Sequence, residues 1–231
     1  MRALPTVPEL AAKIDHAVLR PNSAERDVVA ACAVARREHL ASVCVKPFYV
    51  TKAAKLLEGS GVLVSTVIGF PHGGQAPEVK IGTAMTALRD GAKELDMVIN
   101  IGALLDDDYA TVEREIASVV GLAHGNEAIV KVILETSYLD DAHKAIAARI
   151  AVAVGADFVK TSTGFAPEGA TVDDVRLLKQ IVGEHVGVKA AGGIRTLDDA
   201  LALISAGADR LGSSATEEIL AELRRRRGED V

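Results

Sequence analysis

The stretch FVKTSTGF, residues 158–165, decides the fold and the chemistry that we expect of this chain. It opens with an apolar run typical of a buried strand and places Lys160 directly before a small polar turn. A buried ammonium is costly unless it finds partners or loses its proton. Lys189 repeats the arrangement in GVKAAGG, residues 187–193. The two stretches predict a pair of strand lysines in which one amine is activated by the other.

The size and composition of the chain suit a single large α/β barrel. It has 231 residues, of which 49% are hydrophobic and 25% charged, so a sizeable core can form and disorder is not expected. Aromatic residues make up only 3% and tryptophan is missing, so the core must consist of Ala, Val, Ile and Leu. Such an aliphatic composition is typical of buried parallel strands covered by helices.

Charge and cysteine usage exclude several classes of function. The formal charge of −6 disfavours a protein that binds nucleic acid through phosphate attraction. The four arginines at 224–227 are interpreted as the cationic end of a last helix and not as a nucleic-acid patch. Cys32 and Cys44 give no disulfide framework, and the sequence shows neither a secretory signal nor a membrane-length apolar run. We therefore expect a soluble, cytoplasmic protein without a nucleic-acid or membrane partner.

Apolar strand candidates alternate with helical patterns along the whole chain. We expect strands at residues 13–19, 41–45, 62–68, 94–98, 128–134, 158–160, 187–189 and 210–212. We expect helices at residues 7–12, 23–39, 50–58, 77–90, 109–123, 141–154, 172–182, 197–205 and 216–226. Ser23 is the predicted N-cap of the second helix, and a polar loop is expected after the strand at 94–98.

Eight strands in this length predict an α/β fold consisting of one single-domain (β/α)8 barrel. The domain spans residues 1–231, with a short N-terminal helix and a short, mobile C-terminal tail. A recurring tripeptide supports a single barrel. Gly-Ala-Lys at 91–93 and Gly-Ala-Asp at 155–157 and 207–209 each precede a predicted strand, with the glycine placed to end a helix.

Catalytic groups in such barrels lie at the carboxyl ends of the strands. Titratable candidates in the predicted strands are Asp15, His16, Cys44, Asp96, Lys131, Lys160 and Lys189. Lys160 and Lys189 stand on neighbouring strands, and like charges held close disfavour double ionisation, so one amine should have a lowered pKa. Because a neutral lysine amine attacks carbonyl carbons, the pair favours Schiff-base chemistry.

The remaining candidates carry more than one interpretation. Lys131 lies further from its strand end, with Glu135 downstream, and is interpreted as a member of an internal ion pair. Asp96 has no cation beside it in an apolar strand, so it either satisfies polar groups of the core or relays protons. Cys44 is interpreted as a small core residue and not as a nucleophile, because no histidine is placed to activate it.

Two loops rich in glycine and serine predict a phosphate site. Gly192 and Gly193 follow the seventh strand, and Gly212, Ser213 and Ser214 belong to the eighth strand and the loop after it. Each loop opens a helix, and these two positions of a barrel commonly bind phosphate through backbone N–H groups. The histidines and cysteines show no metal-ligand spacing, so we expect neither a metal nor another cofactor.

With these stretches in place, the sequence resembles the deoxyribose-phosphate aldolases, a class I aldolase family with a (β/α)8 barrel. The resemblance runs from IDH at 14–16 to GSS at 212–214. Its most specific parts are VKTSTGF at 159–165 and VKAAGGIRT at 188–196. Supporting matches lie at residues 43–47, 67–73, 94–100 and 131–136.

The resemblance implies reversible cleavage of 2-deoxy-D-ribose 5-phosphate into acetaldehyde and D-glyceraldehyde 3-phosphate. By this resemblance Lys160 matches the Schiff-base lysine, Lys189 the lysine that lowers its pKa, and Asp96 the acid that shuttles protons. Gly193 and Ser214, with neighbouring backbone, match the phosphate site.

The resemblance also bears on the surroundings of the substrate. Thr161 and Thr163 sit where the family surrounds its substrate, and we expect Asp15 and Cys44 to line the same site. One departure lies at the C-terminus, where several members carry a tyrosine that assists proton transfer and this chain reads GEDV at 228–231. The carbon–carbon bond chemistry does not depend on that residue. The expected partners are phosphosugar and aldehyde substrates and, because a barrel of this kind exposes apolar helix residues, further copies in a homodimer or homotetramer.

Two other functions remain open from the residues. One is a phosphosugar isomerase that uses Asp96 with another carboxylate and keeps the lysines as phosphate ligands. The other is a non-catalytic barrel that senses sugar phosphates. Neither explains two strand lysines together with two phosphate loops.

Overall fold

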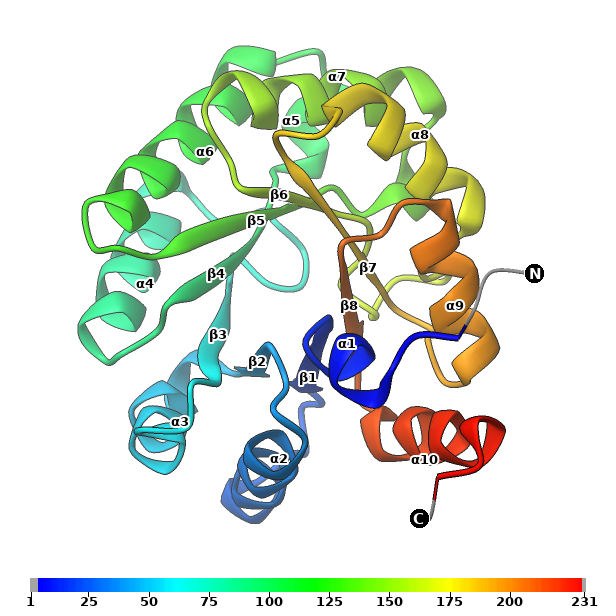
Figure 1. Ribbon diagram of the computed structural model, residues 1–231. Helices are drawn as coiled ribbons and strands as arrows, with labels where there is room; N and C mark the ends of the chain where they lie inside the picture. The colour runs from blue at the N-terminus through cyan, green and yellow to red at the C-terminus, as the bar shows by residue number, and fades with distance from the viewer. Residues whose placement is uncertain (1–3, 230–231) are drawn as a thin grey trace.

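Eight parallel strands close into a barrel in the computed structural model, which describes residues 4–229 (Figure 1). Each strand pairs with the next along the chain, and β8 pairs with β1. The strands are β1 (Ile14–Val18), β2 (Ser42–Val45), β3 (Leu63–Ile68), β4 (Glu94–Val98), β5 (Ile129–Ile133), β6 (Phe158–Lys160), β7 (Gly187–Ala191) and β8 (Arg210–Ser213). The single-domain (β/α)8 barrel predicted from the sequence is confirmed.

Most of the helices form an outer ring around these strands, whereas the first helix lies in front of the barrel opening (Figure 1). The helices are α1 (Val7–Ala11), α2 (Glu25–Glu38), α3 (Val50–Leu57), α4 (Pro77–Arg89), α5 (Ile101–Leu105), α6 (Tyr109–His124), α7 (Asp141–Ala153), α8 (Val172–Val182), α9 (Leu197–Ala206) and α10 (Thr216–Arg227). Two 3-10 turns, η1 (Pro47–Tyr49) and η2 (Thr136–Tyr138), follow β2 and β5. The last two residues of the predicted C-terminal tail, 230 and 231, lie outside the described residues.

Side chains near the helix starts explain where several helices begin. The Thr171 hydroxyl caps α8 by accepting the amide N–H of Asp174 at 3.0 Å. The predicted cap of α2 is wrong by one residue, because Ala24 occupies the N-cap position and has no side-chain acceptor. The Asp27 carboxylate instead accepts the Ala24 N–H at 2.7 Å, and the carbonyl of Ser23 accepts a hydrogen bond from Lys46.

Two further boundaries differ from the sequence prediction. The loop expected after β4 contains the five-residue helix α5, which Asn100 caps by accepting the Ala103 N–H at 3.1 Å. Strand β7 continues two residues past Lys189, because Ala190 and Ala191 pair in register with β8. Lys189 therefore lies in the middle of its strand and not at its end.

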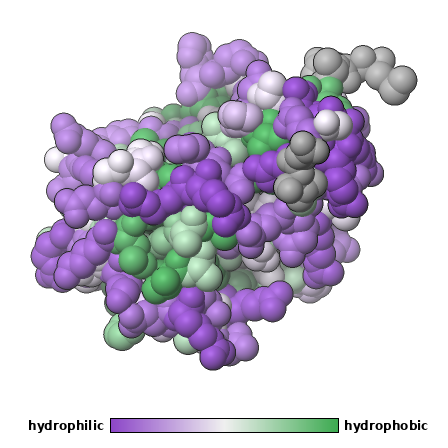
Figure 2. Space-filling model, turned by 60° about the horizontal axis from the view of Figure 1, so that its bottom comes forward, coloured by the Kyte–Doolittle hydropathy of each residue, from purple (hydrophilic) through white to green (hydrophobic). Residues whose placement is uncertain are grey.

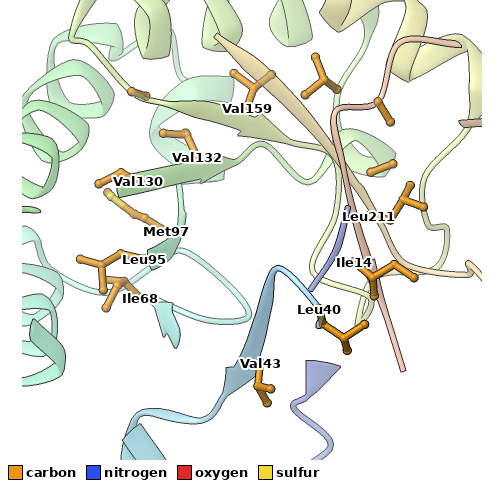
Figure 3. Packing of buried hydrophobic residues seen from close by; sticks show 14 of the residues in the cluster. Ile14, Leu40, Val43, Ile68, Leu95, Met97, Val130, Val132, Val159 and Leu211 are labelled. Carbon is orange, nitrogen blue, oxygen red and sulfur yellow. The ribbon is translucent and has the colours of Figure 1, made fainter. Parts of the chain in front are cut away.

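Alternate residues along each strand separate an apolar outer layer from a charged interior. Leu95 and Met97 of β4 and Val130 and Val132 of β5 point outward and pack between strands and helices (Figure 3). The residues between them, Asp96 and Lys131, are paired in register and point into the barrel. The hydrophobic core is thus a ring outside the strands, whereas barrels usually fill their interior with branched aliphatic side chains.

The outer surface carries most of the remaining charge. Hydrophilic residues cover most of the face shown in Figure 2 and border one apolar area. The arginines at 224–227 occupy the last turn of α10, where Arg224 pairs with Glu38 and Arg226 with Asp198. Within residues 4–229, none of the helices combines the length and the apolar character needed to span a bilayer.

We expect Gly73→Ala to destabilise the protein strongly. Gly73 has φ of 71°, and an added Cβ would collide with the carbonyl oxygen of Ile99, which follows β4. The left-handed backbone and the forced backbone shift together should lower the free energy of unfolding by roughly 3 kcal/mol, measured by urea denaturation.

Gly61→Ala is the matched control. Gly61 has φ of 77°, and nothing lies within 4 Å of its added Cβ. Only the left-handed backbone strain of about 1 kcal/mol should remain there. Equal losses of unfolding free energy in the two variants would show that the loop at Gly73 can move away from the Ile99 carbonyl at little cost, and would contradict this prediction.

Candidate active site

Asp96 lies at the centre of a buried cluster of lysines inside the barrel. Its Oδ2 accepts hydrogen bonds from Lys160 Nζ at 2.8 Å and from Lys189 Nζ at 2.7 Å. Its Oδ1 accepts from Lys131 Nζ at 3.0 Å and from the Ser65 hydroxyl at 3.2 Å. Asp96 is fully buried, and the three lysines are at most 3% exposed. One carboxylate therefore binds three lysine amino groups away from solvent.

Two more carboxylates complete the cluster, one from β1 and one from β4 itself. Asp15 of β1 contacts Lys189 at 2.5 Å, Lys131 at 3.3 Å and Arg210 at 2.6 Å. Glu94 of β4 contacts Lys131 at 2.5 Å and Arg210 at 3.2 Å. Lys131 thus belongs to an internal ion pair, as predicted, but its partners are Asp15, Glu94 and Asp96 and not Glu135. The sequence also gave no sign that Asp96 has cations around it.

The environment separates the pKa values of the three lysines. Burial lowers the pKa of Lys160, and the nearby Lys189 ammonium lowers it further, against the attraction of Asp96. Burial also disfavours the charged form of Lys189, but Asp15 and Asp96 outweigh it and raise the pKa. The same balance with Asp15, Asp96 and Glu94 raises the pKa of Lys131. Lys160 is therefore the one of the three amines that burial and charge favour as neutral.

The carboxylates are held in their ionised form by these cations. Burial would raise the pKa of Asp96, yet Lys131, Lys160 and Lys189 together hold it well below its usual value. Burial likewise opposes ionisation of Asp15, but Lys131, Lys189 and Arg210 hold its pKa far below the usual range. Asp15 and Asp96 therefore favour the ionised form inside the barrel.

A cavity of about 510 Å³ opens above the cluster at the carboxyl ends of the strands. It is lined by residues 15–20, 23, 27, 44, 160, 163–165, 189, 191–195 and 212–214. Lys160 and Lys189 both reach this cavity, whereas Asp96 and Lys131 lie beneath it. A small carbonyl compound in the cavity can therefore meet the Lys160 amine directly.

Most of the residues predicted around the substrate line this cavity. Asp15, Cys44 and Thr163 do so, and so do Gly192, Gly193, Gly212, Ser213 and Ser214. Thr161 does not. Its hydroxyl donates to the Ala191 carbonyl at 3.2 Å and accepts the Ala191 N–H at 3.1 Å, which ties the end of β6 to β7. Burial raises the pKa of the Cys44 thiol, which disfavours a thiolate nucleophile there.

Glu135 shapes the loop that forms one wall of the cavity. Its buried carboxylate accepts the Thr163 N–H at 3.0 Å and the Thr163 hydroxyl, and that hydroxyl oxygen accepts the Phe165 N–H at 3.1 Å. Phe165 in turn meets Phe70 edge to face, with ring centroids 5.3 Å apart. Burial raises the pKa of Glu135 despite these hydrogen bonds. The carboxylate thus fixes the turn after β6 without belonging to the lysine cluster.

Sequence reasoning missed two members of the cluster, Glu94 and Arg210. Glu94 lies two residues before Asp96, so strand alternation puts both side chains on one face. Arg210 opens β8 in register with Lys189. Both signals are present in the sequence, yet they gain meaning only once the strand register is known. Among residues 4–229, no group of His, Cys, Asp and Glu is arranged to hold a metal ion.

Comparisons with known proteins agree on one family. Residues 10–220 match the family described as DeoC/LacD family aldolase. Deoxyribose-phosphate aldolase 1 of Bacillus licheniformis is 51% identical over 215 residues, which cover 93% of this chain and 96% of that protein. The deoxyribose-phosphate aldolase of Thermococcus gammatolerans is 50% identical over 214 residues, covering 92% and 95%.

Solved structures give the same result. The tetrameric deoxyribose-phosphate aldolase of Aeropyrum pernix superposes with a TM-score of 0.89 at 36% identity. The match covers 95% of this chain and 92% of that one. The similarity therefore extends over the whole barrel and includes every strand that contributes to the lysine cluster.

We expect Glu135→Ala to loosen the wall of the cavity between residues 161 and 165. The change removes the acceptor of two Thr163 donors, one of them a buried amide. An unpaired buried donor costs about 1–3 kcal/mol, so amide hydrogen exchange at 163 and 165 should speed up by roughly tenfold or more.

Glu135→Gln provides the control, because a glutamine oxygen can still accept the Thr163 N–H. Its exchange rates should lie close to those of the unchanged protein. Unaltered exchange in Glu135→Ala would contradict the view that Glu135 holds this loop.

Proposed function

Because this chain belongs to the DeoC/LacD family of aldolases, we propose that it reversibly cleaves 2-deoxy-D-ribose 5-phosphate into acetaldehyde and D-glyceraldehyde 3-phosphate. The reaction would pass through a Schiff base on Lys160. One observation carries this proposal. Lys160 reaches the cavity as the amine that burial and Lys189 favour as neutral, whereas Lys131 and Lys189 are held charged by carboxylates.

In the direction of synthesis, neutral Lys160 attacks the carbonyl carbon of acetaldehyde and forms a carbinolamine. Loss of water gives the imine, and loss of a proton from the neighbouring carbon gives an enamine. The enamine carbon attacks the aldehyde of D-glyceraldehyde 3-phosphate, which forms the new carbon–carbon bond. Hydrolysis of the resulting imine then frees the product and restores the amine, so no cofactor is consumed.

Asp96 and Lys189 handle the protons of these steps. Asp96 Oδ2 lies within hydrogen-bond reach of both Lys160 and Lys189, so a proton can pass between the two amines through one carboxylate oxygen. A water in the cavity would carry protons to and from the substrate carbon. Asp15 and Asp96 raise the pKa of Lys189 against burial, and its positive charge adds to burial in lowering the pKa of Lys160.

The phosphate group would bind at the loops after β7 and β8. Gly192 and Gly193 have φ of 88° and 79°, a backbone conformation that suits glycine and turns the loop toward the cavity. The loops lead into α9 and α10, whose N-termini favour an anion. Binding the phosphate at these loops would hold the aldehyde carbon of D-glyceraldehyde 3-phosphate in position for attack by the enamine on Lys160.

The proposed activity carries expectations about the substrates, the oligomeric state and the location of the protein. The phosphosugar and the aldehydes are the partners, and a homodimer or homotetramer is testable by light scattering, since the relative from Aeropyrum pernix is described as a tetramer. Cys32 and Cys44 are free thiols, which supports a reducing, cytoplasmic location.

Borohydride reduction in the presence of acetaldehyde, followed by peptide mass mapping, tests the nucleophile. The expected result is a reduced two-carbon adduct on Lys160. The matched variant Lys160→Met should form no adduct and no product. An adduct on Lys189 would reverse the roles of the two lysines. No adduct under conditions where the phosphosugar still binds would favour an isomerase or a sensor.

Replacing Lys189 by leucine tests the second lysine. Without its ammonium, Asp96 has one cation fewer and Lys160 loses a neighbouring like charge, so Lys160 should hold its proton more tightly. We expect kcat/KM at neutral pH to fall at least roughly 100-fold, consistent with loss of amine activation. Retention of more than about a tenth of the activity would reject this role.

A further inference from the structure

Arg210 is a charged member of the cluster that the proposed mechanism leaves unused. Its Nη1 donates to Asp15 Oδ1 at 2.6 Å and to Glu94 Oε1 at 3.2 Å, inside the barrel. The guanidinium also lies over the Phe158 ring, 5.6 Å from its centroid, and only 16% of the side chain is exposed. A guanidinium keeps its charge at every pH at which proteins are folded.

The contiguous cluster holds one more cation than carboxylates. Ion pairs connect the cations Lys131, Lys160, Lys189 and Arg210 with the carboxylates Asp15, Glu94 and Asp96. Solvent screens these charges weakly because the lysines and carboxylates are buried. The excess positive charge is relieved when one lysine loses its proton.

Of the three lysines in the cluster, Lys160 has the fewest carboxylate contacts. It contacts Asp96 alone, whereas Lys189 contacts Asp15 and Asp96. Lys131 contacts both of these carboxylates and Glu94. Loss of the proton from Lys160 therefore breaks the fewest ion pairs.

We propose that Arg210 is a positioning residue whose permanent charge keeps the cluster one cation in excess and so makes Lys160 the amine that gives up its proton. This inference rests on the proposed Schiff-base function and adds a second activating cation to Lys189. Arg210 acts through contacts that run from Asp15 to Lys189, then to Asp96, and finally to Lys160.

Other titratable groups near Lys160 do not replace Arg210. Cys44, from β2, has its pKa raised by burial and stays a neutral thiol. Glu135, after β5, has its carboxylate held by Thr163, and within residues 4–229 it forms no ion pair with the lysines.

Near Arg210 itself, the remaining charged groups face away from the cluster. Lys13 Nζ donates to the carbonyl of Asp209 at 3.5 Å. The Asp209 carboxylate accepts from Lys179 at 3.2 Å and from the Val188 N–H at 2.9 Å. Asp15 and Glu94 are thus the carboxylates that Arg210 binds.

The test is the pH dependence of kcat/KM for cleavage of the phosphosugar, whose lower limb reports the amine in the free enzyme. Arg210→Met removes the charge and keeps a chain of similar length. Two strand spacings put Arg210 about 10 Å from Lys160, where one charge at an effective dielectric constant of about 20 shifts a pKa by roughly one unit. We expect the limb to move up by about one pH unit, with an approximately tenfold loss of kcat/KM below it.

Three companion variants separate charge from structure. Arg210→Lys keeps the charge, so its limb should stay near that of the unchanged enzyme. Glu94→Gln removes a negative charge, so its limb should move down, and this variant serves on its own if Arg210→Met does not fold. The double variant Arg210→Met with Glu94→Gln restores the excess of one cation, so its limb should return toward the starting pH.

The outcomes decide between charge and packing. An unmoved limb in Arg210→Met, with reduced thermal stability, would make Arg210 a structural residue and overturn the proposal. A shift in Arg210→Lys as large as in Arg210→Met would also overturn it. Borohydride trapping at pH 10 keeps the proposed function separate, because an adduct on Lys160 in every variant upholds the Schiff base whatever the limb does. Absence of that adduct from the unchanged enzyme would reject the proposed function itself.

Discussion

The structure depends on one carboxylate, Asp96, that binds three lysines in the buried interior of the barrel. A single charge cannot neutralise three ammonium groups, so the arrangement is stable only if other carboxylates share the lysines or one amine is neutral. Asp15 forms ion pairs with Lys131 and Lys189, and Glu94 forms one with Lys131. Lys160 has Asp96 as its carboxylate partner. The reactive amine is therefore a consequence of how charges are distributed over the whole cluster.

The barrel makes this distribution possible because its strands are two-sided. Outward residues such as Leu95, Val130 and Val159 form the apolar ring under the helices, as Figure 3 shows. That ring supplies the hydrophobic stabilisation, which leaves the inward positions free to carry charges at a cost in desolvation. The closed sheet then brings together side chains that are far apart in sequence, such as Asp15 and Lys189, 174 positions apart.

The sequence predicted much of this, for identifiable physical reasons. Apolar runs that alternate with helical patterns located all eight strands, and β4, β6 and α8 were predicted with the bounds that the structure has. Lys160 and Lys189 stood out because lysine is rare in apolar runs. The partners of Asp96 and Lys131 could not be predicted, since they depend on register and barrel closure. The start of α2 was wrong because Asp27, and not Ser23, supplies the side-chain hydrogen bond there.

The central claim is that Lys160, alone among the three clustered lysines, has a lowered pKa. The most direct measurement is an NMR titration of the lysine side-chain amines, with Lys131, Lys160 and Lys189 assigned through single substitutions to methionine. The Lys160 amine should titrate below the usual lysine pKa of about 10.4 and below both other amines, as this claim requires. A Lys160 amine that titrates at or above that value, or after Lys189, would contradict it.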